Sequence, residues 1–178
     1  MILLLQIMFF LALIHFIYES ILAPSWRQSL RYRLFALRDE LCALHTNCRD
    51  CLDEEHFAYL QTSIDTMIAM LHRYDVAAIA AAELRYRRDP EFRRRVDVRA
   101  MALEDCDDSQ FQSIRRRSVE LIARATAINS GMLCAPVYPF AVMGIGFSTV
   151  QALLRKLAAL SRWELETIAP EAAGIAAG

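Results

Sequence analysis

The sequence lacks the motifs by which many enzymes bind phosphate or activate a nucleophile. No phosphate-binding loop, no Gly-rich nucleotide signature and no Ser/His/Asp arrangement occurs among its 178 residues. It also lacks an excess of charge of either sign, because the formal net charge is −1. A strongly basic surface is the usual electrostatic mark of a nucleic-acid-binding domain, so we do not expect nucleic acid as a partner.

Charged side chains are absent from two long stretches. The first ends at Glu19, and the segment from Met1 to Ala23 consists mainly of Leu, Ile, Phe and Met. About 20 apolar residues in a helix cross the bilayer core, which is about 30 Å thick. Basic residues follow this segment, beginning at Arg27, whereas a cleaved signal peptide carries them before its apolar core. We therefore predict that residues 1–23 form a retained transmembrane anchor whose C-terminal end faces the cytoplasm.

The second uncharged stretch covers residues 125–154. It predicts a second apolar span over residues 131–154, although Pro136 and Pro139 also permit a re-entrant hairpin or an interrupted helix in a soluble core. Arginines are more numerous on the flanks that face the middle of the chain, which favours a cytoplasmic middle and both termini outside. Residues 155–178 are expected to form an amphipathic helix at the membrane interface, followed by a disordered tail. The helix is expected to run from Val150 to Thr167, and the apolar residues on it are Leu153, Leu157, Leu160 and Trp163.

Residues 25–128 show the periodic apolar positions of packed helices, at alternating spacings of three and four. The first series is Leu30, Leu34, Leu37, Leu41 and Leu44, and the second is Phe57, Leu60, Ile64, Met67, Leu71, Tyr74 and Ala78. We predict that the two series form an antiparallel hairpin, because the connection between them is short. Pro24 should end the anchor helix, and Ser25 should cap the next one together with Gln28.

Start signals indicate the helices that follow. Asp53 is a natural N-cap, and Asp89 followed by Pro90 is typical of a helix N-terminus. The acidic run at residues 104–108 should separate the last two helices. The residues expected to face inward are Phe92, Val96, Leu103, Phe111, Ile114, Leu121, Ala125 and Ile128. The arginines expected on solvated faces are Arg93, Arg94, Arg95, Arg99, Arg115, Arg116 and Arg117.

Three polar residues interrupt the anchor, namely Gln6, His15 and Glu19. His15 and Glu19 are four residues apart and therefore share one side of a helix. Ionisable groups within a membrane are costly and often functional, which makes these residues candidates for a polar face inside the bilayer. The alternative is that Glu19 lies at the membrane interface while His15 faces a neighbouring helix.

One short stretch is rich in potential metal ligands, namely Cys42, His45, Cys48, Cys51 and His56. Cys-x-x-Cys with a nearby His is typical of zinc binding, but a tetrahedral site usually draws ligand pairs from separated segments. Cys48 and Cys51 also continue the leucine spacing, and a free thiol packs as a small apolar group. We therefore expect no bound metal or other cofactor, and keep a metal or redox sensor as an alternative.

Two arginines are each followed by a histidine after six intervening residues. The pairs are Arg38 with His45 and Arg49 with His56. This spacing is similar to that of the helical ribonucleases of the HEPN class. The resemblance implies RNA cleavage by these side chains on an all-helical domain, which makes a membrane-tethered ribonuclease an alternative function.

These features predict an all-α fold, in which a transmembrane anchor and a second apolar span flank a cytoplasmic helical bundle. The expected function is non-enzymatic, that of an oligomeric interaction or effector module at the bacterial inner membrane. Its expected partners are the lipid bilayer, further copies of the chain and a cytosolic protein. By layout alone, the chain resembles small membrane effectors of bacterial phage-defence systems, some of which form a pore or otherwise permeabilise the bilayer.

Overall fold

The computed structural model describes residues 2–47, 53–131, 155, 158, 160 and 162–168, and this part of the chain is almost entirely helical. Its helices are α1 (Ile2–Ile17), α2 (Ala23–Asn47), α3 (Glu54–Met70), α4 (Val76–Arg88), α5 (Pro90–Glu104) and α6 (Ser109–Asn129). A π-helical turn, η1 (Tyr18–Leu22), joins α1 to α2, and a 3-10 turn, η2 (Leu71–Arg73), follows α3. Residues 162–168 form a further helical stretch. The predicted all-α fold is confirmed, whereas the predicted second span at 131–154 lies outside the described residues, apart from Gly131.

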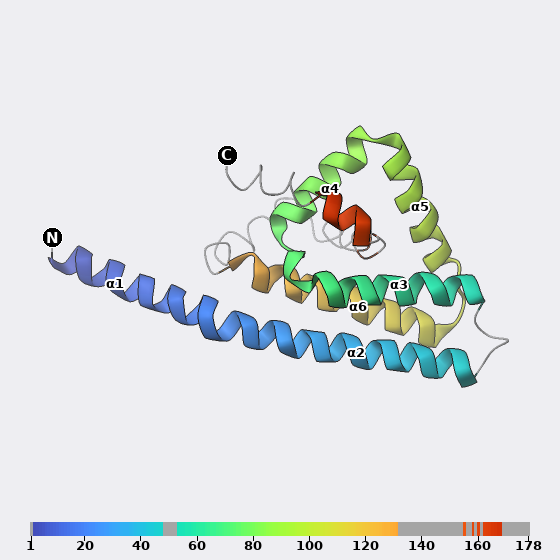
Figure 1. Cartoon of the computed structure of the whole chain (residues 1–178), viewed down its shortest axis with the longest axis horizontal. Coiled ribbons are helices and arrows are strands. Elements are labelled where there is room, and N and C mark those ends of the chain that lie inside the picture. The colour runs from blue at the N-terminus through green and yellow to red at the C-terminus, as the bar shows by residue number, and fades with distance from the viewer. Residues whose placement is uncertain are drawn as a thin grey trace.

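The first three elements form one continuous helix from Ile2 to Asn47, whose N-terminal half projects beyond the rest of the molecule (Figure 1). The side chains of α1 are exposed along its whole length. Among the residues that the structure describes, this is the one helix long and apolar enough to cross a membrane. By length and composition, its N-terminal part could be a membrane anchor or a signal sequence.

The prediction that Pro24 ends the anchor helix is wrong. The helix passes into the π turn just before the proline, where the backbone N–H of Ala23 bonds to the carbonyl of Tyr18 five residues earlier. Such a turn changes the backbone hydrogen-bond pattern locally, so the missing N–H and the ring of Pro24 are accommodated without a break. Ser25 accordingly lies inside α2, and the predicted capping box with Gln28 is wrong as well.

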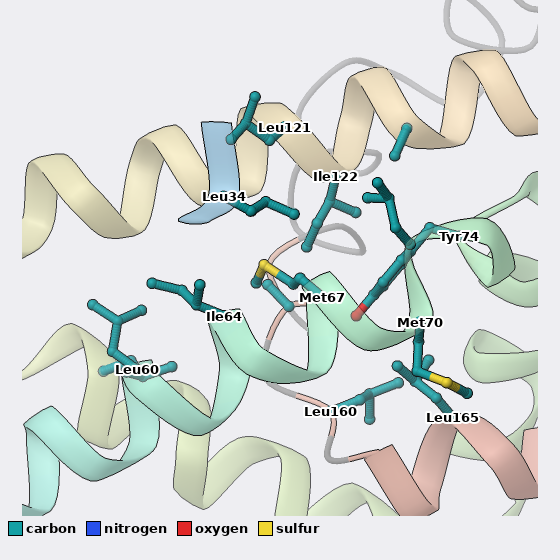
Figure 2. Packing of buried hydrophobic residues seen from close by; sticks show 14 of the residues in the cluster. Leu34, Leu60, Ile64, Met67, Met70, Tyr74, Leu121, Ile122, Leu160 and Leu165 are labelled. Atoms are coloured by element: carbon teal, nitrogen blue, oxygen red, sulfur yellow. The ribbon is translucent and has the colours of Figure 1, made fainter. Parts of the chain in front are cut away.

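The leucine series of α2 faces the core of the helical domain. Leu30, Leu34, Leu37 and Leu41 are each at most 5% exposed. Helices α3 and α6 run alongside this face of α2 (Figure 1), and Figure 2 shows Leu34 near both Ile122 of α6 and Met67 of α3. The predicted seam and the α2–α3 hairpin are confirmed, and α6 is a second partner that the pattern did not identify. Burial of each leucine stabilises the domain by about 1.5–3 kcal/mol, so these contacts hold it together within one chain.

The second apolar series is buried as predicted except for Phe57, which is only partly covered, and it is divided between two helices. Helix α3 ends at Met70, the turn η2 follows, and Asp75 starts α4 by accepting the N–H of Ala78 at 2.7 Å. Because Asp at an N-cap satisfies a backbone N–H that has no partner in the helix, it favours a new start over a continued helix. The series keeps its inward direction across this break because Tyr74, at the turn, is itself buried.

Tyr74 carries an unsatisfied polar atom into the core. Its hydroxyl points among the apolar side chains around α3 (Figure 2) and has no hydrogen-bond partner within the described part of the chain. Burial raises the pKa of Tyr74 well above its usual range. We expect Tyr74→Phe to increase the free energy of unfolding by about 1 kcal/mol, because it removes a buried unpaired group at nearly constant shape. Urea denaturation of the full-length protein in detergent micelles measures this change.

Tyr86→Phe is the matched control for this substitution. The hydroxyl of Tyr86 donates to Oδ1 of Asp97 at 2.6 Å, so its removal should lower stability instead. A Tyr74→Phe variant that is less stable than the wild type would contradict our description of this hydroxyl.

The later helices begin where the sequence predicts. Asp89 accepts the backbone N–H groups of Glu91 and Phe92, and Asp108 accepts that of Phe111. The predicted inward residues of α5 and α6 are buried, except that Ile128 is only partly covered. These starts could be predicted because a cap and the apolar positions after it are local features of the sequence.

The C-terminal helical stretch packs into the domain instead of lying apart from it. Figure 1 shows residues 162–168 between α4 and α5, and both Leu165 and Ile168 are buried. Trp163, one of the apolar residues of the predicted interfacial helix, is 61% exposed. The chain is not helical at Leu160, which lies inside the helix predicted from Val150 to Thr167. The described part of this segment therefore contributes side chains to the core, while Leu153 and Leu157 lie outside the described residues.

Candidate functional site

The apolar helix meets the helical domain at the C-terminal end of α6. The hydroxyl of Tyr18 donates to the carbonyl of Ile128 at 2.9 Å, and Nε of Arg27 donates to Oδ1 of Asn129 at 2.8 Å. The Nδ2 atom of Asn129 donates in turn to the carbonyl oxygens of Leu71 and Tyr74, at 2.7 and 2.9 Å. One asparagine therefore joins α2, α6 and the turn η2.

A turn after α6 completes this junction. Ser130 Oγ accepts the backbone N–H of Val76 at 3.2 Å and donates to the carbonyl of Thr126 at 2.7 Å. Gly131 has a φ of 73°, a left-handed conformation that ends many helices and that residues with a side chain rarely adopt. Oε1 of Glu19 would lie 3.6 Å from a Cβ atom at this glycine, so the end of the apolar helix lies directly beside the end of α6.

The three polar residues predicted for the anchor lie in different places along the helix. Glu19 lies at the junction, whereas Gln6 and His15 are exposed on α1 and have no hydrogen bond or ion pair with any described residue. Nine residues, or about two and a half helical turns, separate Gln6 from His15. The two side chains consequently lie on opposite sides of α1, so Gln6 does not belong to the side that His15 and Glu19 share.

Four basic residues gather around the junction, namely Arg27, Arg31, His72 and Arg73. Burial, followed by the positive charges of Arg73, Arg27 and Arg31, lowers the pKa of His72 below its ordinary value. No carboxylate of the described residues lies within 4.0 Å of these three guanidinium groups. Both His72 and Arg73 are exposed, which leaves the charge accessible from outside the domain.

Two aromatic residues mark the level of the junction along the continuous helix. The rings of Tyr18 and Trp26 meet edge to face, with 6.0 Å between their centroids, and Trp26 is 45% exposed. Amphipathic aromatic rings are enriched at membrane–water interfaces. Their position between the apolar helix and the first arginines is the one expected at such an interface.

The structure does not bring the proposed ribonuclease residues together. The guanidinium of Arg38 lies 3.8 Å from Asp65 and over the ring of Phe35, whereas His45 stacks on Phe57 with 4.1 Å between ring centroids. No hydrogen bond or ion pair joins Arg38 to His45 in the described part of the chain. The second pair is half described: His56 contacts the ring of Phe111, and Arg49 lies outside the described residues.

The cysteine and histidine cluster is described only in part. Cys42 is a free, half-buried thiol on α2, and Nε2 of His45 lies 3.5 Å from Glu54. Within residues 2–47, 53–131 and the described C-terminal positions, no three His, Cys, Asp or Glu side chains are grouped so as to hold a metal. Cys48 and Cys51 lie outside the described residues, and so does their predicted place on the leucine seam.

A buried carboxylate is the charged group that the sequence pattern did not reveal. The side chain of Glu164 is 2% exposed and lies 2.6 Å from Nη1 of Arg99 and 3.4 Å from Nε of Arg95. Arg95 and Arg99 keep 38% and 28% of their side chains exposed, and the acid they pair with is itself buried. Their partner is 65 or more residues away along the chain, and no local spacing could have indicated it.

Sequence reasoning also missed the hydrogen bonds of Tyr18, Arg27 and Asn129. The available signal was the stretch from Asn129 to Gly131, because a polar residue followed by glycine is typical of a helix C-terminus. No protein-family model, no curated protein and no solved structure matches the chain. The fold and the junction define a class: an all-α protein with one candidate membrane-spanning helix in the part of the chain that the structure describes.

Proposed function

We propose that the protein is a membrane-anchored, non-enzymatic interaction module, with its helical domain held at the cytoplasmic face of the bacterial inner membrane. The observation that carries this proposal is the continuous helix from Ile2 to Asn47. Its first part exposes apolar side chains throughout, and its second part supplies a buried seam to the helical domain. As a helix, the residues from Ile2 to Leu22 extend about 31 Å, which matches the thickness of a bilayer core.

Contacts at the junction support a retained anchor over a cleaved signal sequence. Ala23, which follows the apolar segment, is 0% exposed in the middle of the continuous helix. Cleavage beside it would remove Tyr18 and its hydrogen bond to α6. These contacts favour an apolar helix that stays attached to the folded domain over one that serves only as a targeting signal.

Charge and aromatic residues support the cytoplasmic orientation. Arg27, Arg31 and Arg33 follow the apolar segment, and no charged side chain precedes Glu19. Arginine and lysine near the end of a span favour the cytoplasmic side. Trp26, exposed just before these arginines, is placed as an interfacial anchor would be.

We further propose that the module self-associates through the side of α1 that carries His15. The leucine series of α2 is buried within its own chain, so it is not available for a coiled coil with a second copy. His15 is exposed on the apolar helix, where a lipid environment would give it no hydrogen-bond partner. Polar side chains of neighbouring transmembrane helices satisfy one another in this situation.

Mass photometry of the detergent-purified full-length protein tests this proposal. We expect a defined oligomer, and we expect His15→Leu to weaken its association about tenfold per hydrogen bond lost between helices. Gln6→Leu is the matched control, because it removes a polar group on the opposite side of α1 and should leave the oligomer intact. A monomeric wild type would contradict self-association and would favour an anchor that recruits a cytosolic partner.

Induced expression in cells separates the possible activities of such a module. An oligomer that permeabilises the bilayer, as a defence-type effector would, should depolarise the cells. This effect should persist in a variant with both His45→Ala and His56→Ala. Degradation of RNA that depends on these two histidines would instead support the ribonuclease alternative.

A further inference from the structure

The basic side chains at the junction come from two elements that are fixed to each other. Arg27 and Arg31 lie one turn apart on α2, while His72 and Arg73 both belong to η2. Asn129 accepts a hydrogen bond from Arg27 and donates two to backbone carbonyls at η2. The relative position of the two elements therefore depends on this asparagine. After burial, the positive charges of Arg73, Arg27 and Arg31 also contribute to lowering the pKa of His72.

The arginines at the junction lack the carboxylate partners that other arginines of the domain have. Arg85, Arg99 and Arg117 each have a carboxylate within 4.0 Å. By contrast, Arg27, Arg31 and Arg73 have none among the residues described, and Nε of Arg31 is buried without a hydrogen-bond partner there.

The nearest acids in the sequence do not fill this role. Asp75 caps α4 by accepting the N–H of Ala78, and Glu19 lies beside Gly131. Unpaired guanidinium groups close to one another repel, so an anion placed between them would be bound favourably. The junction thus has the charge and the free donors of an anion-binding site.

The position of the site along the helix indicates which anion would reach it. Trp26 is exposed at the interfacial level, and Arg31 lies about 8 Å further along the axis of α2. Phosphate groups of the headgroup layer occupy this zone directly outside the bilayer core. Guanidinium groups bind phosphate oxygens through paired hydrogen bonds.

We infer that Arg27, Arg31 and Arg73, with His72 beside them, form a binding site for the phosphate headgroup of an anionic phospholipid in the cytoplasmic leaflet. The inference rests on the proposed function, because it requires that α1 lie in the bilayer. A bound headgroup would fix the rotation of the helical domain about the anchor, since α2 and η2 would contact the same lipid.

Native mass spectrometry of the full-length protein in detergent, titrated with dioleoylphosphatidylglycerol, tests this inference. We expect the triple variant Arg27→Gln, Arg31→Gln, Arg73→Gln to bind this lipid about a hundredfold more weakly than the wild type. The matched control is Arg88→Gln, Arg94→Gln, Arg116→Gln. It removes the same charge from exposed positions away from the junction and should bind like the wild type. Equal binding by the wild type and the junction variant would overturn the inference.

Two further comparisons keep the test decisive. If the triple variant does not fold, Arg31→Gln alone should still weaken binding about fivefold, because Arg31 makes no hydrogen bond or ion pair in the described part of the chain. Dioleoylphosphatidylcholine and inorganic phosphate should both bind weakly, and inorganic phosphate binding as tightly as phosphatidylglycerol would overturn the lipid assignment. Failure of the proposed anchor would be seen separately, as loss of the wild-type protein from carbonate-washed membranes.

Discussion

Replacing both Phe9 and Leu13 by arginine is expected to remove the protein from the membrane. Both side chains are exposed on α1, near the middle of the apolar segment, and four residues apart on one side of the helix. An arginine at the centre of a transmembrane helix costs about 2.5–3.5 kcal/mol during insertion. Two of them would cost about 6 kcal/mol, which corresponds to a shift of about ten-thousandfold in the partition. Carbonate washing of membranes from expressing cells, followed by immunoblotting, measures the retained fraction.

The matched control for this prediction is Phe9→Ala with Leu13→Ala. It shortens the same two side chains without adding charge, so most of the protein should remain in the washed membrane. Intact mass measurement of the retained wild type should show that the apolar segment is still present. Retention of the arginine variant at wild-type levels would refute our assignment of α1 as an anchor.

Arg99→Leu is expected to lower the free energy of unfolding by about 3 kcal/mol. The substitution leaves the carboxylate of Glu164 buried at 2% exposure without its nearest cationic partner. Removing one member of a buried ion pair typically costs 3–5 kcal/mol. Arg95, at 3.4 Å from the same carboxylate, retains part of the compensation, so the effect should fall at the lower end. Urea denaturation of the full-length protein in micelles, followed by circular dichroism, gives the difference.

The reverse substitution should cost less, which makes the pair a specific test of the geometry. Glu164→Leu removes one carboxylate partner from Arg95 and Arg99, whose side chains are 38% and 28% exposed. Water can solvate both, and a leucine is suited to the buried position. Arg94→Leu, on the exposed side of the same helix, is the control and should change stability by less than about 0.5 kcal/mol. Equal costs for Arg99→Leu and Glu164→Leu would indicate that Glu164 is not buried.

The parts of the fold that could be predicted depend on local sequence features. The seam from Leu30 to Leu41 follows from spacing alone, since any helix places those residues on one side. The start of α5 follows from Asp89 and Pro90, because both act on the backbone within one turn. Neither feature required knowledge of what lies across the core.

The parts that could not be predicted depend on contacts between distant residues or on backbone adjustment. Pro24 is compatible with a continuous helix only because a π turn forms before it, and sequence rules treat a proline as a stop. The burial of Glu164 depends on α5, which lies far from it along the chain. The junction itself depends on Asn129. This residue lies inside an uncharged stretch, and no charged or nucleophilic neighbour in the sequence marks it as part of a site.

The uninterrupted helix from Ile2 to Asn47 has a consequence for how the protein responds to its surroundings. A transmembrane helix that is longer than the local hydrocarbon thickness tilts to keep its apolar side chains covered. Because α1 and α2 are one helix and α2 lies within the core of the domain, any such tilt turns the whole domain through the same angle. With α1 in the membrane, as we propose, the thickness of the bilayer would thereby set the orientation of the domain relative to the membrane surface, without a hinge or a bound signal.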